Sequence, residues 1–392
     1  MKDVALCLGG GRWQLDLIRA VRSRGYRTLV ADRSPACPGR AEADIFAEVD
    51  TSDVQAVLAL ACTHRVRLVL AEQTDRVVPV AAELNERLNL PGIRPDVALR
   101  FTDKLVMRRS LQGHGVPMPS FQEISRLDEA ATFADNVGYP VIIKPKRAQS
   151  SMGVFKIDDP IQLNAAFLLT MAHSKRTPIL IERFIEGIEI TVEGLCLDRK
   201  HDVLAISEKE HYDFNPCIAR RLAYPPRFPE SVLMRIRETT NTIVQVLGLT
   251  DGLTHAEFRM HEDNPYLVEI AARGGGTRIA PLIVPWVSGI DVYNLWLNRL
   301  EGISVHMPVP LKRAAVLEFF SFPQGRVKAI RGVDAAAKFV ADIGLTFAPG
   351  DNLKRPQDDT GRLGYFIALG DNRDIVDETS AKVRDMVTVE YE

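Results

Sequence analysis

The sequence predicts a mixed α/β and α+β fold, with an open parallel sheet at the N-terminus followed by smaller α+β units. Short apolar runs alternate with amphipathic stretches through the first 92 residues, which is the pattern of βαβ units. Residues 90–95, rich in Pro and Gly, interrupt that pattern. From about residue 121 it changes to strand, helix, strand, strand, which is typical of a small α+β module. The 392 residues suffice for two or three packed units.

Four strands are expected in the N-terminal sheet. The apolar runs place them at residues 4–8, 27–31, 45–49 and 68–71. Gly9 to Gly11 form the turn into a first helix, but a dinucleotide fingerprint would need glycine where Gln14 stands, which argues against NAD. Glu72 and Asp75 follow the fourth strand, where open sheets present ligand contacts. Glu72 is therefore a candidate substrate residue, and capping of the next helix by Thr74 or Asp75 is the alternative.

The remaining chain divides into four further units. A helix that begins near Thr102 carries Lys104 in a linking segment. A small α+β module with a polar Gly/Ser loop follows, then a larger α+β unit with acidic strands, and finally a region of short strands and turns. The predicted units are 1–92, 93–122, 123–194, 195–304 and 305–392.

Composition excludes several classes of protein. The 49 basic and 51 acidic residues are dispersed and give a net charge of −2, so no basic stripe for nucleic acid is expected. The five cysteines lack CxxC or zinc-ligand spacing and predict reduced thiols. No segment reaches the ~18 uninterrupted apolar residues that a membrane span needs. We expect a cytoplasmic protein without nucleic-acid or membrane partners.

The first candidate site is a strand-end lysine with a polar loop behind it. Lys144 ends an apolar run, and a buried ammonium needs an anionic partner. The loop contains Ser150, Ser151 and Gly153, whose small side chains let backbone N–H groups approach phosphate oxygens. A simple connection between strands is the alternative.

Carboxylates stand at the ends of several apolar strands. Glu182 and Glu189 lie where they can hold an adenine amino group and a ribose diol, with a solvated hairpin as the alternative. Glu257 and Glu269 belong to two strands joined by a polar turn and can face each other in an antiparallel hairpin. Two carboxylates so close repel, so a shared Mg²⁺ that also binds phosphate is the favoured reading and a proton-sharing pair the alternative.

Arginines follow the second of these strands. Arg273 precedes three glycines and Arg278 comes shortly after them, so a planar cation stands where backbone can approach a ligand. A surface arginine beside a turn is the alternative. His211, Arg220 and Arg221 are placed in a polar loop that could close over a second substrate. Arg220, Arg278 and His255 join Glu72 as candidate substrate residues.

In this order the motifs resemble the ATP-grasp superfamily, and among its members the L-amino-acid (dipeptide) ligases and other carboxylate–amine ligases. The similarity runs over nearly the whole chain. The matching segments are Thr102-Asp103-Lys104, 115–119, 138–145, 150–154 and 361–368.

The resemblance implies an ATP-grasp fold: an N-terminal Rossmann-like sheet, a mobile lid, a large catalytic unit and a small β-rich C-terminal region. It implies that the polar loop around residues 150–154 is a mobile flap and that Lys104 and Lys144 contact ATP phosphates beneath it. It also implies that Glu182 and the Ile185 backbone read adenine and that Glu189 holds ribose. Glu257 and Glu269 would coordinate Mg²⁺, with Mn²⁺ as an alternative ion. Arg273 and Lys144 would be catalytic, and the assembly would be a homodimer.

One position departs from the family pattern. Many members continue the second metal glutamate as E-x-N, whereas this sequence has Ala271 in place of the asparagine ligand. Two glutamates can still suffice, because Mg²⁺ keeps waters and takes phosphate oxygens. The purine-pathway carboxylases carry a segment resembling "PRPHNSGH" after that glutamate, and its absence disfavours bicarbonate as a substrate.

Three functions are consistent with these residues. The first is a ligase that activates a carboxylate as an acyl phosphate and passes it to an amine, with an amino acid as one substrate. The second is a biotin-independent carboxylase acting on a nucleotide-like amine. The third is a non-catalytic ATP-binding protein, which only Ala271 favours.

Overall fold

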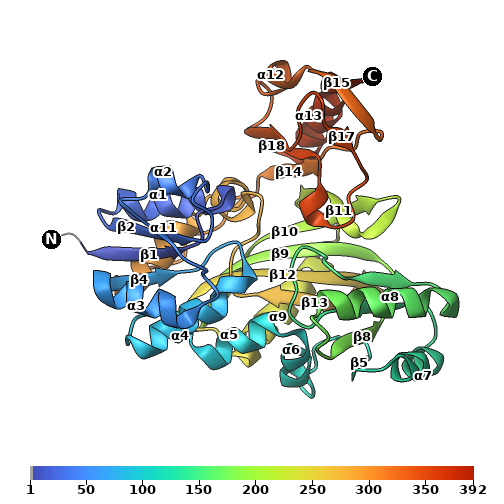
Figure 1. Ribbon diagram of the computed structural model, residues 1–392, viewed down its shortest axis with the longest axis horizontal. Helices are drawn as coiled ribbons and strands as arrows, with labels where there is room; N and C mark the ends of the chain where they lie inside the picture. Colours follow the sequence, from blue (N-terminus) through green and yellow to red (C-terminus); the bar gives the residue numbers. More distant parts are fainter. Residues whose placement is uncertain (1–2) are drawn as a thin grey trace.

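The computed structural model describes residues 3–392 and begins with the predicted parallel sheet (Figure 1). Its strand order is β3-β2-β1-β4, all parallel, and its central strands are buried because helices cover both faces. The strands are β1 (Val4–Leu8), β2 (Arg27–Asp32), β3 (Ile45–Glu48) and β4 (Val66–Leu70). The helices are α1 (Leu15–Ser23), α2 (Gly39–Glu42), α3 (Val54–His64) and α4 (Val78–Arg87). The four predicted strands are confirmed to within two residues at each end.

Two helices link this sheet to the next unit. α5 (Pro95–Thr102) begins with a proline at its first position, where no N–H is needed. α6 (Lys104–Leu111) is capped by Asp103, whose carboxylate accepts hydrogen bonds from the N–H groups of Leu105 and Val106 at 3.1 and 3.2 Å. This cap fixes Lys104 as the first residue of its helix.

A small antiparallel sheet with strand order β5-β8-β6-β7 forms the unit that we call the lid. Its elements are β5 (Phe121–Ile124), α7 (Leu127–Val137), β6 (Val141–Lys144), β7 (Phe155–Ile157), α8 (Pro160–His173) and β8 (Ile179–Arg183). The predicted boundary between residues 194 and 195 falls inside β9 (Ile188–Leu197), which belongs wholly to the next sheet. The change of sheet lies between β8 and β9, at Gly187. Its φ is 135°, and a Cβ there would lie 1.8 Å from the Met260 carbonyl oxygen.

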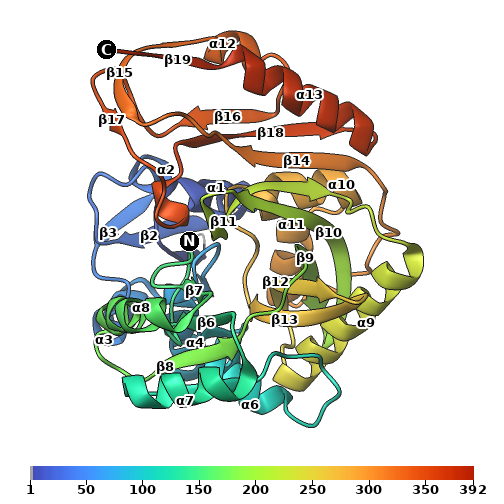
Figure 2. The same ribbon diagram turned by 90° about the vertical axis from the view of Figure 1, so that its right-hand side faces the viewer.

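The largest sheet has eight strands in the order β13-β12-β9-β10-β11-β14-β18-β16 (Figure 2). Besides β9, these are β10 (Lys200–Tyr212), β11 (Asn215–Tyr224), β12 (Gly252–His261), β13 (Asn264–Ala271), β14 (Ala314–Phe319), β16 (Asp342–Leu345) and β18 (Gly364–Gly370). Its helices are α9 (Glu230–Leu247), α10 (Val284–Ser288) and α11 (Val292–Leu300). Strands from the C-terminal region therefore extend the sheet that β9 to β13 begin.

One predicted loop is wrong. His211 lies in β10, and Arg220 and Arg221 lie in β11. Their polar character reflects a row of ion pairs along two long strands, not exposure in a loop.

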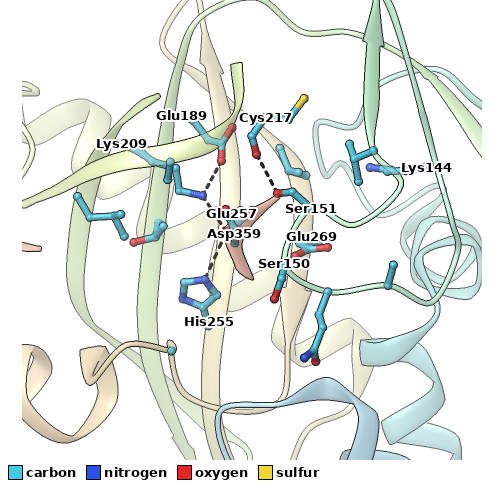
Figure 3. Close-up of a pocket in the computed structure, with 18 of the residues that line it drawn as sticks. Lys144, Ser150, Ser151, Glu189, Lys209, Cys217, His255, Glu257, Glu269 and Asp359 are labelled. Atoms are coloured by element: carbon cyan, nitrogen blue, oxygen red, sulfur yellow. Dashed lines mark hydrogen bonds and ion pairs between the residues drawn. The ribbon is translucent and has the colours of Figure 1, made fainter. Parts of the chain in front are cut away.

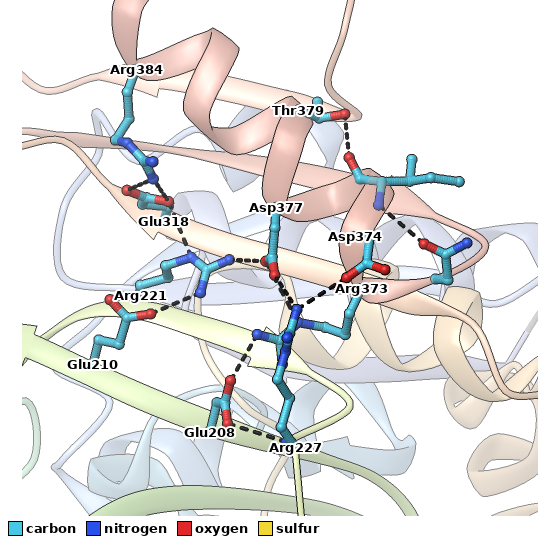
Figure 4. A network of polar contacts seen from close by, with 12 residues as sticks. Glu208, Glu210, Arg221, Arg227, Glu318, Arg373, Asp374, Asp377, Thr379 and Arg384 are labelled. Atoms are coloured by element: carbon cyan, nitrogen blue, oxygen red, sulfur yellow. Dashed lines mark hydrogen bonds and ion pairs between the residues drawn. The ribbon is translucent and has the colours of Figure 1, made fainter.

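The C-terminal region also contains a helix that the sequence analysis did not predict, α13 (Arg373–Met386). It packs on β14 and β18 beside α12 (Val333–Ala336) and a small sheet of β15 (Gly325–Arg331), β17 (Asn352–Leu353) and β19 (Thr388–Tyr391). A charged network holds the helix to the large sheet (Figure 4): Arg221 pairs with Asp377, and Arg384 Nη1 lies 2.7 Å from Oε1 of buried Glu318. Between residues 3 and 392, no helix has the length and apolar character to cross a membrane.

Candidate active site

A cavity of about 590 Å³ lies between the lid, the large sheet and the N-terminal unit (Figure 3). This volume is within the range of small-molecule sites. The predicted site residues that line it are Lys104, Lys144, Ser150, Ser151, Glu182, Ile185, Glu189, His255, Glu257, Glu269 and Arg273. The fold thus brings together side chains that are up to 169 positions apart in the sequence.

Lys144 and Glu182 form a buried ion pair with a third partner. Lys144 Nζ lies 2.6 Å from Glu182 Oε2, and Arg108 Nε lies 2.9 Å from Glu182 Oε1. Burial lowers the pKa of Lys144, and the Arg108 charge adds to this while Glu182 opposes it. Burial alone would raise the pKa of Glu182, but Arg108 and Lys144 outweigh it and hold that pKa below its usual value.

Sequence reasoning missed Arg108, which has no exposed surface. Its Nη2 also donates to the Val268 carbonyl oxygen at 2.8 Å, so it connects α6, the lid and β13. The signal was present in the spacing, because Arg108 follows Lys104 by four residues and shares its helix face.

Lys104 connects the flap to the acidic hairpin. Its Nζ lies 2.7 Å from Glu269 Oε2 and donates to the Ala148 carbonyl oxygen at 2.8 Å. Burial would lower the pKa of Lys104, but the Glu269 charge prevails and raises it. A fully charged lysine therefore stands between one acid of the hairpin and the loop predicted to bind phosphate.

The hairpin pairing itself is confirmed. Glu257 lies directly opposite Glu269 in the register of β12 and β13, which are joined by a turn with φ values of 47° at Glu262 and 61° at Asp263. The two carboxylates are oxygen donors of the kind Mg²⁺ takes, and each is balanced by its own lysine, Lys104 or Lys209. Among residues 3–392, no three His, Cys, Asp or Glu side chains gather as a complete protein ligand set. The donor set thus fits an ion that draws further ligands from phosphate and water.

Lys209 is a second functional candidate that sequence reasoning missed. Its Nζ lies 2.6 Å from Glu189 Oε1 and 2.8 Å from Glu257 Oε1, and it lines the cavity. Burial acts to raise the pKa of Glu189, but Lys209 and His211 outweigh it and lower that pKa to about 2. Arg259 Nη2 lies 2.9 Å from Glu189 Oε2 and adds a further cation beside Lys209. Lys209 was missed because the segment directly after it was predicted to be a loop, so no strand fixed the direction of its side chain.

His255 is held in its charged form. Its Nδ1 lies 2.7 Å from Glu193 Oε1, and its Nε2 lies 3.5 Å from Glu257 Oε1. Burial would lower the pKa of His255, but Glu193 outweighs burial and raises it to about 9. Burial likewise acts to raise the pKa of Glu257, yet Lys209 and His255 hold it well below its usual value.

Arg273 is oriented by the N-terminal unit. Its Nε and Nη2 each lie 2.9 Å from an oxygen of Asp75, at the start of a short 3₁₀ turn (Asp75–Val77). Glu72 lies beneath the same segment, where its Oε2 accepts a hydrogen bond from the Gly274 N–H at 3.0 Å. Burial raises the pKa of Glu72 to about 7. Glu72 therefore supports the turn after β13 and is absent from the lining that residues 3–392 give the cavity.

The flap is tied to its surroundings at three points. Ser151 Oγ donates to the Cys217 carbonyl oxygen at 2.8 Å, and Gln149 Oε1 accepts from the Asp75 N–H at 2.9 Å. Gly153 packs against His173 of α8, where a Cβ would lie 2.7 Å from that residue's Cβ. Its contribution is therefore backbone shape, with a φ of 71°.

Two predicted substrate residues have other partners. Arg220 lies 3.1 Å from Glu318 and also pairs with Glu210. Arg278 lies 3.0 Å from Asp16 of α1 and 3.2 Å from Asp342 of β16, so it joins the N-terminal unit to the C-terminal strands. Neither belongs to the cavity lining described for residues 3–392.

Comparison with known proteins identifies two domains in this chain and several similar proteins. Residues 137–281 match the model of the ATP-grasp domain, and residues 318–392 match the L-amino acid ligase C-terminal domain 2. The chain is 23% identical to the L-arginine-specific L-amino acid ligase of Bacillus subtilis, over 77% of this chain and 76% of that protein. It is 24% identical to the formate-dependent phosphoribosylglycinamide formyltransferase of Mycolicibacterium smegmatis, over 94% and 91%.

A solved structure supports the fold directly. The crystal structure of an L-amino acid ligase from Bacillus licheniformis matches with a TM-score of 0.84 at 21% identity, over 100% of this chain and 99% of that one. The N-terminal sheet, the lid and the eight-stranded sheet are thus the parts of a known architecture. The chain therefore contains an ATP-grasp domain and the C-terminal domain of the L-amino acid ligases, and its fold is that of the ATP-grasp ligases.

Proposed function

We propose that this chain is an ATP- and Mg²⁺-dependent carboxylate–amine ligase that uses an amino acid as one substrate and forms an amide or peptide bond. The observation that carries the proposal is the joint placement of Lys104, Glu269 and Glu257 in one cavity, with the lysine ammonium 2.7 Å from Glu269. Such an array can hold a nucleoside triphosphate, because the lysine can pair with phosphate oxygens and the two carboxylates can bind the Mg²⁺ that accompanies them.

In the first half of the proposed reaction, an acyl phosphate forms and particular side chains bind the phosphates. A substrate carboxylate oxygen attacks the γ-phosphorus of ATP, the bond to the ADP oxygen breaks, and an acyl phosphate forms. Lys104 and Lys144 hold the phosphates, and Arg273, fixed by Asp75, stabilises the transferred group. Mg²⁺ held by Glu257 and Glu269 would neutralise charge on the phosphate oxygens.

The second half of the reaction makes the new bond. The amine nitrogen attacks the acyl carbon, the carbon–oxygen bond to phosphate breaks, and the amine loses a proton as phosphate leaves. In this proposal Glu182 and the Ile185 backbone read adenine, Glu189 holds ribose, and the lid with Ser150 and Ser151 excludes water that would hydrolyse the acyl phosphate.

The test is ADP and phosphate release from ATP and Mg²⁺ across amino acids, singly and in pairs, with the products weighed by mass spectrometry. Release that depends on a pair, with a product heavier than either amino acid, supports the proposal. ATP binding without release under any condition contradicts it and favours the non-catalytic alternative.

A second candidate follows from the similarity to the formyltransferase over 94% of the chain. Formate and bicarbonate with nucleotide-like amines therefore belong in the same assay. Turnover with formate or bicarbonate alone would contradict the amino-acid ligase and identify an enzyme that activates one-carbon acids.

We also propose a homodimer, on the strength of the family resemblance. Light scattering after size-exclusion chromatography should then give twice the 43.6 kDa of one chain. A mass of one chain at all concentrations would contradict it.

A further inference from the structure

Strands β11, β14 and β18 present an apolar face to the cavity. Leu222 lies opposite Leu317, and Phe319 lies opposite Tyr365, so all four side chains point to one side of the sheet. All four line the cavity. Trp13 from the N-terminal unit closes this wall with its ring edge-on to Tyr365, at a centroid distance of 5.5 Å. A ligand group resting here would lie against the side chains of this wall.

The apolar wall continues the face that carries the acids. Glu257 is opposite Glu269 on one side of β12 and opposite Thr191 of β9 on the other. Lys209 of β10 is opposite both Glu189 and Leu222. Acids, then cations, then apolar side chains therefore follow one another across a single sheet face.

An ion pair lies over the apolar wall. Arg362 Nη2 is 2.6 Å from Asp359 Oδ1, and the Arg362 guanidinium carbon is 3.8 Å from the Phe319 ring centroid. Both charged side chains line the cavity, with 14% and 26% of their surfaces exposed. They come from the short turn Asp359–Gly361 and the residue after it, in the C-terminal region.

This pair keeps bonding capacity for a ligand. A guanidinium has five N–H groups. Within residues 3–392, the hydrogen bonds and ion pairs of the Arg362 guanidinium are Nε to the Ala219 carbonyl oxygen at 3.1 Å and Nη2 to Asp359. Burial lowers the pKa of Arg362 and raises the pKa of Asp359, so each charge lacks the hydration that it would have outside.

The pair also faces the cavity that contains the proposed reacting groups. Asp359 lines the same cavity as Lys209 and Glu257, and Figure 3 labels all three residues there. The Asp359 N–H donates to the Ser150 carbonyl oxygen of the flap at 3.2 Å. A ligand held by Asp359 would thus lie between the flap and the acidic hairpin.

We propose that Asp359 and Arg362 bind the amino acid that serves as the amine, with its ammonium group at Asp359 and its carboxylate at Arg362. Its side chain lies on the wall of Leu222, Leu317, Phe319, Tyr365 and Trp13 and is therefore apolar. A zwitterion offers one charge of each sign at short spacing, which matches the pair. The inference rests on the proposed ligase function.

The test separates the amine site from the activation step. Hydroxylamine is a small nucleophile that traps an acyl phosphate as a hydroxamate and needs neither member of the pair. Wild type, Arg362→Gln and Asp359→Asn are compared with hydroxylamine, leucine and leucinamide as nucleophiles. Arg331→Gln is the matched control, because Arg331 forms an exposed pair with Glu390.

Arg362→Gln should raise the KM for leucine about 10- to 100-fold, the range expected for a lost hydrogen bond to a charged group. The KM for leucinamide, which has no carboxylate, should change little. Asp359→Asn should raise the KM for both nucleophiles, and wild type should use leucine at least about 10-fold better than aspartate or lysine. Hydroxamate formation should persist in both variants.

The inference is overturned if Arg362→Gln leaves the KM for leucine unchanged, or if hydroxamate formation falls as far as the leucine reaction does. In the latter case the pair serves the first substrate or the fold. A preference of wild type for charged amines would overturn the apolar assignment. Absence of hydroxamate from wild type with every carboxylate offered would contradict the ligase function itself.

Discussion

Arg273 forms a bidentate ion pair with Asp75, in which Nε and Nη2 each lie 2.9 Å from a separate carboxylate oxygen. The pair joins the turn after β13 to the N-terminal unit. It sets the direction of the arginine proposed to stabilise the acyl phosphate, and the two residues are 198 positions apart. In the proposed mechanism, the N-terminal unit would contribute to catalysis by orienting an arginine that belongs to another unit.

Replacing Asp75 by asparagine should lower kcat by about 10- to 100-fold, because the guanidinium loses a charged, two-point partner. ATP binding, measured by calorimetry, should change little, since Lys104 and Lys144 remain. Asp16→Asn, which removes a partner of Arg278 outside the cavity, is the control. Equal losses of kcat in both variants would count against a specific role for the Arg273–Asp75 pair.

Arg108 is expected to be essential for stability. Arg108→Met leaves Glu182 with one buried cation instead of two, and breaking such a buried pair costs about 3 to 5 kcal/mol. The free energy of unfolding is measured by urea denaturation. The neighbouring exposed Arg109→Met should change it by less than about 1 kcal/mol. A similar small change at Arg108 would show that Lys144 alone compensates Glu182.

The acidic hairpin should control turnover and its dependence on Mg²⁺. Glu269→Gln and Glu257→Gln should each lower kcat by at least about 100-fold, since each removes a charge proposed to hold the ion. Raising the Mg²⁺ concentration should recover part of the activity in each variant. Turnover near the wild-type level, with unchanged Mg²⁺ dependence, would remove the hairpin from the proposed mechanism.

His255 should make stability depend on pH. Its pKa rises from 6.5 to about 9 on folding, so its contribution is complete below pH 6.5 and is lost as the pH rises through 9. Within that window the free energy of unfolding falls by up to about 1.4 kcal/mol per pH unit. The pKa of Glu72 is raised from 4.5 to about 7, so its contribution to stability is complete below pH 4.5 and is lost as the pH rises through 7.

The difference in unfolding free energy between wild type and His255→Asn isolates this effect. Asparagine can still donate to Glu193, but it does not titrate. The difference should shrink between pH 6.5 and 9, and a constant difference would mean that His255 carries no proton in the folded protein at neutral pH.

The sequence predicted the parts of this site that lie on regular elements. The four N-terminal strands and the Glu257–Glu269 pairing follow from apolar periodicity, which fixes which side chains share a face. Arg108 and Lys209 also lie on regular elements, but they were missed because their roles depend on partners 74 and 48 residues away. Arg220 and Arg278 were placed at the site by charge alone, and tertiary ion pairs direct them elsewhere.

The most direct test of the central claim is the transfer of oxygen from the substrate carboxylate to phosphate. The enzyme is supplied with ATP, Mg²⁺, an amine and an acid labelled with ¹⁸O in its carboxylate, and the released phosphate is analysed by mass spectrometry. An acyl phosphate predicts one ¹⁸O atom in each phosphate, because the carbon–oxygen bond breaks when the amine attacks. Unlabelled phosphate from an enzyme that makes the amide would contradict this account.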